Sequence, residues 1–496
     1  MQIEQLLSKS FCDVYHIDLE KEYEIEFVDA IDLLVPERID IIAKYKYVEC
    51  YDKGYDIDFI RNLYVKHIEA FSLGKFTEPG NPNKVCLQDY LNIFHELINT
   101  IRETGINPDI SVIPVGRNNI ILNGAHRASI ALYYGLKVPI VRLEHLYNDF
   151  GLVFFEKRQL DQKYLDFMMQ EYIKLNSNLY IACLYPAASG REKLNKAIKV
   201  MKQRTNILYK KDIPITTDGL RNFMIQIYKS DMNPWIGSYE NRYAGVYDKL
   251  KVCTGKEDLR IFILDCESLE DIRIVKKEIR AIYEIGNSSI HITDTKEEAV
   301  SLANIVFNAN SIHCLNYGKP DYFIKFNRKL NVFRNRIEDH MLSLDEFIID
   351  SSSVMGLYAL RDIRDIDFLS VSSKYHLIEN NSINCHHSYV SYYHTTIDNL
   401  LMNPENYLVY HDTKFITLEV CKRFKSNRDE RKDRDDVKLI NTILNKDSNK
   451  LFKQYLITSR RIKRNIYYAY LLSLHIVIQK GKGLILIALK KLGFRR

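Results

Sequence analysis

Two aspartates separated by one residue, Asp365 and Asp367, have the clearest potential for chemistry in this sequence. They lie in a strand-like stretch, RDIRDIDFLS, in which side chains two positions apart point to the same side. Two carboxylates held close together repel each other, and a divalent cation is the usual partner that relieves this repulsion. The spacing therefore predicts a metal site with both aspartates as ligands and Mg²⁺ as the expected ion.

A serine-rich turn precedes this acidic pair. Asp350-Ser-Ser-Ser353 follows the apolar run FII and comes before a helix-like segment. Hydroxyl groups and the free amide groups at the start of a helix are suited to holding phosphate. We therefore expect the turn to contact a polyphosphate beside the metal.

The turn followed by D-x-D resembles the nucleotidyltransferase fold of the DNA polymerase β superfamily. A later stretch, TKFITLEVCKRFK with RDERKDRDDVKLI, is similar to the K-x-R-x-K-D-x-x-D segment of small-molecule nucleotidyltransferases. The resemblance implies a nucleoside triphosphate, ATP or CTP, as the second ligand beside Mg²⁺. It assigns Mg²⁺ to Asp365 and Asp367, phosphate contacts to Ser352 and Ser353, and the stabilisation of released pyrophosphate to Lys422 and Lys432.

The resemblance also implies a third carboxylate, for which Glu419 is the first candidate and Asp412 the second. The family turn is normally Gly-Ser or Gly-Gly, whereas this chain has Ser-Ser. Two alternatives remain open: a degenerate, inactive site, or an ordinary strand with solvated charges followed by a salt-bridged helix.

A second candidate site lies in the stretch IILNGAHRASI. An apolar run stops at Asn-Gly and restarts as a helix with His126 and Arg127 in its first turn. Gly124 lets the backbone approach an anion, the helix start offers free N–H donors, and an arginine provides two parallel donors. This composition predicts a phosphate site, although an ordinary turn with capping side chains is the alternative.

The strand, NGAHR turn, helix, Gly135 and next strand resemble the core of the ParB/sulfiredoxin-like fold over residues 70–145. The resemblance implies that Gly124, His126 and Arg127 contact nucleotide phosphate. Sulfiredoxin carries a cysteine in this turn and Ala125 stands here, so its redox chemistry is not expected. Glu78 could be the carboxylate that activates an acceptor hydroxyl, or a solvated loop residue.

The sequence predicts a multidomain α/β (α+β) protein. We expect a helical lead-in at 1–70, a ParB/sulfiredoxin-like domain at 71–150, an α/β middle domain at 179–330, a nucleotidyltransferase-like mixed-sheet domain at 331–450 and a basic amphipathic helical tail at 451–496. An amphipathic helix, LQDYLNIFHELINTIRETG, is expected to end at Gly105.

Polar residues of the middle domain offer weaker signals. His291 and Asp294 could line an acceptor or sugar pocket, or could belong to helix caps. The single tryptophan, Trp235, is expected in a core or turn rather than as a stacking platform. Cys385-His-His387 lacks partners at ligand spacing and does not predict zinc.

Charge is distributed unevenly along the chain. Ten of the 70 Lys and Arg residues, and no Asp or Glu, lie in residues 460–496, which leaves 60 basic and 64 acidic residues before them, a net charge of −4. A body of this charge makes nucleic acid a poor partner. Nine scattered cysteines without a CxxC pair, and no signal-peptide pattern, favour the cytoplasm.

The tail contains fourteen uncharged residues, NIYYAYLLSLHIVI, between basic clusters. This run is shorter than the roughly 20 residues that span a bilayer. It predicts a peripheral segment on an anionic membrane surface, with packing on the body as the alternative.

Together these features favour a cytoplasmic, peripherally membrane-associated Mg²⁺-dependent nucleotidyl- or phosphoryltransferase. The expected acceptor is a sugar or polyol, or a larger glycan, in cell-surface polysaccharide synthesis. The alternative is a ParB-like nucleotide-sensing protein with a degenerate transferase domain.

Overall fold

The computed structural model describes residues 3–78, 83–229, 233–445 and the isolated positions 466 and 473. The chain is a mixed α/β protein with three small sheets, which confirms the predicted fold class at this level. Apart from those two positions, the predicted tail at 451–496 lies outside the described residues. None of the described helices is long and apolar enough to cross a bilayer.

The N-terminal lobe, residues 3–150, contains a sheet of order β1-β3-β2. Its strands are β1 (Ile25–Asp29), β2 (Ile113–Val115) and β3 (Lys137–Arg142). β1 pairs antiparallel and β2 parallel with β3. The first 70 residues, expected as a helical lead-in, thus share a sheet with the segment that carries the NGAHR turn.

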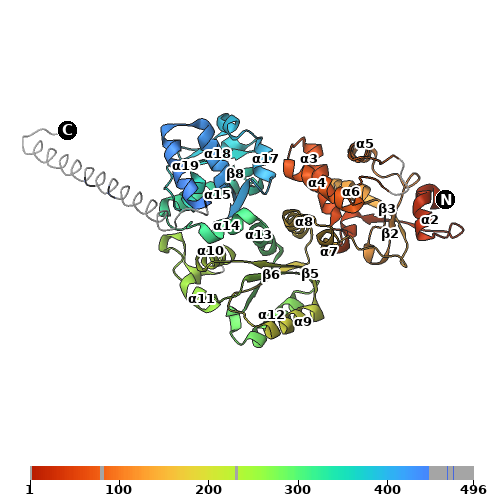
Figure 1. Cartoon of the computed structure of the whole chain (residues 1–496), viewed down its shortest axis with the longest axis horizontal. Helices are drawn as coiled ribbons and strands as arrows, with labels where there is room; N and C mark the ends of the chain where they lie inside the picture. Colours follow the sequence, from red (N-terminus) through yellow and green to blue (C-terminus); the bar gives the residue numbers. More distant parts are fainter. Residues whose placement is uncertain (1–2, 79–82, 230–232, 446–465, 467–472, 474–496) are drawn as a thin grey trace, which may run out of the picture.

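Four longer helices pack on one another beside that sheet (Figure 1), and the NGAHR turn opens the last of them. They are α3 (Asp40–Lys53), α4 (Asp58–Ser72), α5 (Leu87–Thr104) and α6 (Ala125–Tyr134). The predicted amphipathic helix is confirmed as α5, which buries residues at three- and four-residue spacing and ends at Gly105 with φ 71°. That positive φ is readily accessible only to glycine, and the helix stops where the sequence predicted.

The middle lobe, residues 179–308, contains an antiparallel sheet of order β5-β6-β4-β7. Its strands are β4 (Leu179–Leu184), β5 (Asn206–Ile213), β6 (Leu259–Asp265) and β7 (Ile290–Ile292). Alternate residues of β4 enter different cores. Ala182 and Leu184 pack with α9 (Arg191–Arg204) and α12 (Leu269–Tyr283), whereas Ile181 and Cys183 face α10 (Thr217–Ile227) and α13 (Lys296–Val306). The two-residue period of the strand places helices on both faces.

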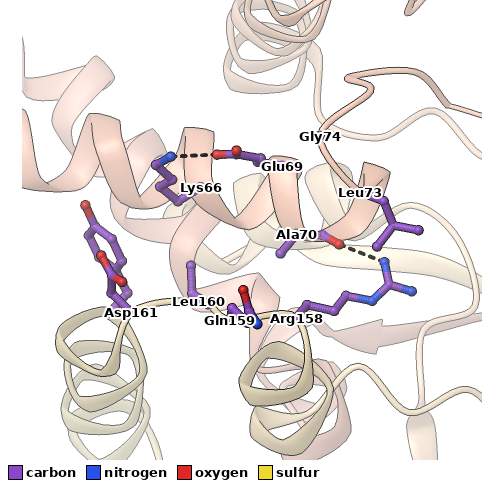
Figure 2. A pocket seen from close by; sticks show the side chains of 10 residues that line it. Lys66, Glu69, Ala70, Leu73, Gly74, Arg158, Gln159, Leu160 and Asp161 are labelled. Carbon is purple, nitrogen blue, oxygen red and sulfur yellow. Dashed lines mark hydrogen bonds and ion pairs between the residues drawn. The ribbon is translucent and has the colours of Figure 1, made fainter.

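One buried helix, α8 (Gln162–Leu175), joins the N-terminal and middle lobes. Its residues from Tyr164 to Ile173 are all buried, and the apolar ones among them belong to a hydrophobic core that continues from α3 to α13. α7 (Leu152–Lys157) precedes it. Arg158, between α7 and α8, donates to the backbone oxygens of Ala70 and Phe71 at the end of α4, at 2.7 and 2.9 Å (Figure 2). A cavity of about 410 Å³ opens at this corner, lined by the end of α4 and by the segment between α7 and α8, and it therefore lies at the joint between the two lobes (Figure 2).

The C-terminal lobe, residues 309–445, contains a mixed sheet of order β10-β9-β8-β12-β11. Its strands are β8 (Phe347–Ile349), β9 (Ile366–Ser370), β10 (Ile383–Cys385), β11 (Tyr407–Tyr410) and β12 (Thr413–Ile416). Helices α14 (Ala309–Tyr317), α15 (Ile324–Asp339), α16 (Ser353–Leu357), α17 (Ile397–Met402), α18 (Leu418–Arg428) and α19 (Arg431–Leu444) accompany it. Its hydrophobic core runs from Cys314 to Ile440 and is separate from the core of the other lobes.

Candidate metal centre and anion pocket

Three side chains that can bind a metal meet on the C-terminal sheet. Asp350 directly follows β8, Asp367 is the second residue of β9, and His386 directly follows β10. The imidazole lies between the carboxylates, with Nδ1 3.2 Å from Asp350 Oδ2 and Nε2 3.2 Å from Asp367 Oδ1. One ligand atom from each residue lies within 4.8 Å of the others, and this is the only such group of three among the described residues.

Strand pairing brings these distant residues together. β9 lies between β8, its antiparallel neighbour, and β10, its parallel neighbour. The backbone N–H of Asp350 donates to the oxygen of Asp367 at 2.8 Å, and the N–H of His386 donates to the oxygen of Phe368 at 2.9 Å. The cluster is therefore fixed by the register of three strands.

The carboxylate of Asp350 is only partly satisfied within the protein. The Tyr393 hydroxyl donates to its Oδ2 at 2.7 Å, and the Tyr393 ring stacks on Phe424 at 4.6 Å. The Asp350 side chain is fully buried, and its Oδ1 atom has no hydrogen-bond partner among the residues that the structure describes. A buried carboxylate oxygen without a partner is costly, and a bound cation would satisfy it.

The electrostatics of the cluster centre on His386. Burial alone would lower the pKa of this imidazole, but Asp350 and Asp367 outweigh burial and raise it to about 10. At neutral pH without a metal, His386 is therefore an imidazolium that neutralises part of the carboxylate charge. A metal that binds the imidazole nitrogen must first displace this proton.

The donor set restricts the kind of ion that fits. Two carboxylates are suited to Mg²⁺, Mn²⁺ and Zn²⁺, whereas an imidazole favours Mn²⁺ or Zn²⁺ over Mg²⁺. The residues fit a divalent cation, and Asp350, Asp367 and His386 are the side chains that would hold it.

The predicted serine turn lies directly beside this cluster. Ser351 has φ 55°, a left-handed conformation that redirects the chain after Asp350. Ser352 and Ser353 are both buried, and the hydroxyl of Ser353 has no hydrogen-bond partner within the described part of the chain. Cys421 of α18 donates its thiol to the oxygen of Ser351 at 3.1 Å, which ties the turn to the helix behind it.

The other predicted carboxylates lie elsewhere. Asp365 is half-buried in a bend, because β9 begins only at Ile366 and strand alternation does not extend to Asp365. Glu419 is exposed in the first turn of α18. Asp412 lies between β11 and β12, where it pairs with Lys229 and accepts a hydrogen bond from Ser301 Oγ at 2.5 Å. None of the three belongs to the cluster of Asp350.

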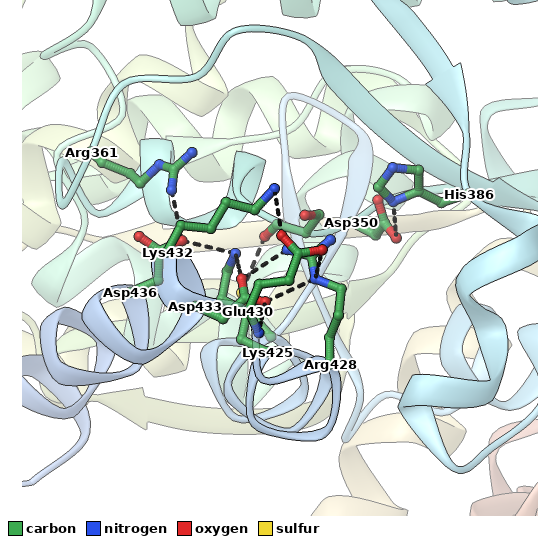
Figure 3. A network of polar contacts seen from close by, with 11 residues as sticks. Asp350, Arg361, His386, Lys425, Arg428, Glu430, Lys432, Asp433 and Asp436 are labelled. Carbon is green, nitrogen blue, oxygen red and sulfur yellow. Dashed lines mark hydrogen bonds and ion pairs between the residues drawn. The ribbon is translucent and has the colours of Figure 1, made fainter.

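The predicted pyrophosphate lysines lie on α18 and α19. Lys422 is half-buried, and Lys432 is exposed and pairs with Glu430 at 2.9 Å. The buried cation of this region is instead Lys425, which lies 3.4 Å from Asp433 and 2.9 Å from Asp436. Arg428 pairs with Asp433 and Arg361 pairs with Asp436, so a network of ion pairs ties α19 to α18 and to the segment before β9 (Figure 3).

The NGAHR turn forms the second site. Gly124 has φ 92°, a backbone conformation that residues with a Cβ rarely adopt, so glycine is favoured at this position. Arg127 Nη1 donates to the hydroxyl of Ser111 and to the oxygen of Val112, the latter at 3.0 Å. The hydroxyl of Tyr64 lies 3.0 Å from His126 Nε2. Burial, with Lys44 and Lys84, holds the pKa of His126 well below its ordinary value, so this imidazole is neutral.

A cavity of about 790 Å³ opens on this turn. Besides Arg127 it is lined by Arg38, Lys44 and Lys84, and by the carboxylates of Asp40 and Glu78. Buried Asp40 binds both Arg38 Nε, at 2.9 Å, and Lys44 Nζ, at 2.6 Å, while Lys84 pairs with Glu78 at 2.7 Å. Four cations against two carboxylates leave an excess of positive charge, which is suited to an anionic ligand.

No family model, no curated protein and no solved structure matches the chain.

Sequence reasoning missed His386 as a partner of the acidic residues and named Asp350 only as the start of a turn. The available signal was the position of both residues at strand ends, directly after FII and INC. The parallel pairing that brings β10 beside β9 is not visible in the sequence.

Proposed function

We propose that this protein is a divalent-metal-dependent transferase that moves a nucleotidyl or phosphoryl group from a nucleoside triphosphate, ATP or CTP, to a hydroxyl of a sugar or polyol. The observation that carries the proposal is the pair of buried carboxylates, Asp350 and Asp367, next to the serine turn. Within the described residues, the Oδ1 atom of Asp350 has no hydrogen-bond partner and could bind the cation. The resemblance to the nucleotidyltransferase fold supports the same reaction class.

Residues of the cluster and the turn beside it would bind the cation and the phosphate. Asp350, Asp367 and His386 would hold the cation, which when bound supplies positive charge that neutralises polyphosphate and activates the acceptor hydroxyl. The free hydroxyl of Ser353 donates a hydrogen bond to a phosphate oxygen. Tyr393 fixes the orientation of Asp350 through its hydroxyl group.

A product screen by mass spectrometry tests the reaction. The full-length protein is incubated with ATP or CTP, Mg²⁺ or Mn²⁺, and a panel of sugar and polyol acceptors. Asp367→Asn should reduce product formation by about 100-fold or more, because it removes one of the metal's anionic ligands.

Asp365→Asn is the matched control for this experiment. It makes the same chemical change two residues away, outside the cluster. Full activity in Asp367→Asn would rule out the metal site. Loss of activity in Asp365→Asn alone would contradict the cluster and would favour Asp365 as a metal ligand, as the sequence predicted.

A second candidate function, nucleotide sensing, is favoured by the cationic cavity at the NGAHR turn. In this case the cavity binds ATP or CTP and the acidic cluster has no catalytic role. Calorimetric titration of each nucleotide with and without Mg²⁺ distinguishes the two. Binding without metal, lost in Arg127→Gln and accompanied by no product, would favour the sensor.

A further inference from the structure

A third cavity, of about 820 Å³, lies in the middle lobe and shares no lining residue with the two sites above. It is bounded by the end of α10, by α11 (Val246–Cys253), by α12 and by β7. Its volume is in the range of small-molecule sites.

One wall of this cavity is aromatic. Trp235, in the short helix η4 (Pro234–Ile236), remains 44% exposed, and its ring meets that of Tyr228 edge-on at 5.1 Å. The Trp235 turn is held in place by Gly245, where a Cβ would come 1.8 Å from the Trp235 oxygen. The predicted turn position of Trp235 is thus observed, but its side chain lines a cavity instead of entering a core.

Two positive charges stand beside this wall without carboxylate partners. Within the described part of the chain, neither Lys249 nor Arg280 has an acidic group within 4 Å, and the buried Nε of Arg280 lacks a hydrogen-bond partner. Lys249 Nζ donates to the oxygen of Asn287, at 2.8 Å, and lies 5.6 Å from the Tyr228 ring centre.

The carboxylates of the cavity are already engaged. Asp248 pairs with Lys251 at 3.2 Å, and Asp294 pairs with Lys276 at 2.9 Å. Glu298 accepts from the backbone N–H of Asp294 at 2.8 Å. Burial lowers the pKa of Lys249, and the nearby Arg280 lowers it further. An anion between the two cations would relieve this repulsion.

A neutral histidine completes the lining. His291 of β7 lies edge-on to the Tyr228 ring at 5.6 Å. Burial, together with Lys276, lowers its pKa to about 3, so the imidazole carries no charge at neutral pH. It offers one donor and one acceptor nitrogen for hydroxyl groups or a base edge.

We infer that this cavity binds a phosphate ester with a flat face, its phosphate between Lys249 and Arg280 and its flat face against Trp235. Arginine and lysine are the usual phosphate ligands, and the face of an indole stacks equally on a nucleobase or on the C–H face of a sugar. The flat group therefore has two sources, a nucleoside or a hexose. This inference does not depend on the proposed metal centre.

The single tryptophan of the chain makes a direct test possible. Because Trp235 is the only indole, its fluorescence reports on this cavity alone. The full-length protein in a chelating buffer is titrated with adenosine 5′-monophosphate, with glucose 1-phosphate and with inorganic phosphate. We expect saturable fluorescence change with at least one ester, and binding of inorganic phosphate at least about 10-fold weaker. The better ester identifies the flat group.

Matched variants locate the phosphate. Arg280→Gln and Lys249→Gln should each weaken ester binding about 10-fold or more, whereas Lys277→Gln, an exposed lysine on the same helix as Arg280 and outside the cavity lining, should leave it unchanged. Asp367→Asn should also leave it unchanged, which separates this site from the metal centre. No saturable change with either ester, equal binding of inorganic phosphate, or full binding in Arg280→Gln would overturn the inference.

Discussion

The metal centre and the NGAHR cavity each contain a histidine, and the two histidines differ in charge. The pKa of His386 is raised to about 10, although burial opposes this, because two carboxylates flank the ring. His126 is buried near Lys44 and Lys84, and its pKa lies well below the ordinary value. Both imidazoles are largely buried, so the difference shows that neighbouring charge decides whether a buried imidazole carries a proton.

The largest expected loss of stability follows substitution of Asp40, the buried carboxylate that offsets the cations of the NGAHR cavity. Asp40→Asn leaves Arg38 and Lys44, both buried, without their shared partner. Removing one member of a buried ion pair costs about 3–5 kcal/mol of unfolding free energy, which we expect to observe by chemical denaturation.

Glu69→Gln is the matched control for Asp40→Asn. It breaks the exposed pair with Lys66 on α4 (Figure 2), where we expect less than about 1 kcal/mol. Equal effects of the two variants would mean that Asp40 does not offset the buried cations.

A smaller effect is expected in the pH dependence of stability, with opposite signs at the two histidines. The raised pKa of His386 gives a stabilising contribution that is complete below the unfolded pKa of about 6.5 and is lost as the pH rises through about 10. The lowered pKa of His126 means that the unfolded chain takes up a proton which the folded chain does not, so stability falls as the pH drops below about 6.5.

Denaturation curves across this pH range test both signs. In a metal-free buffer, His386→Gln should flatten the loss of stability on the alkaline side, and His126→Gln should flatten the loss on the acid side. If His386→Gln flattened the acid side instead, the imidazole of the metal-free cluster would be neutral.

The sequence correctly predicted the elements that depend on the local pattern of apolar and polar residues. The three- and four-residue spacing of apolar residues located α5, and the apolar run before Asp350 located β8 and the serine turn. It placed Asp367 at a candidate metal site, and the structure puts that residue beside Asp350 and His386.

What the sequence left undetermined depends on contacts between distant residues. His386 reaches the cluster only through parallel pairing of β10 with β9, and Asp365 lies outside it because the strand starts one residue later. On α18, packing against the core buries Lys425, whereas Lys422 is half-buried and Arg423 is exposed. Residue types alone do not tell which lysine faces the core.

Calorimetric titration of Mn²⁺ into the full-length protein near pH 7, in buffers of different ionisation enthalpy, tests most directly whether Asp350, Asp367 and His386 form a metal site. Because His386 carries a proton at this pH, we predict binding with release of about one proton per ion, lost in Asp367→Asn and retained in Asp365→Asn. Binding without proton release, or undiminished binding in Asp367→Asn, would contradict the assignment.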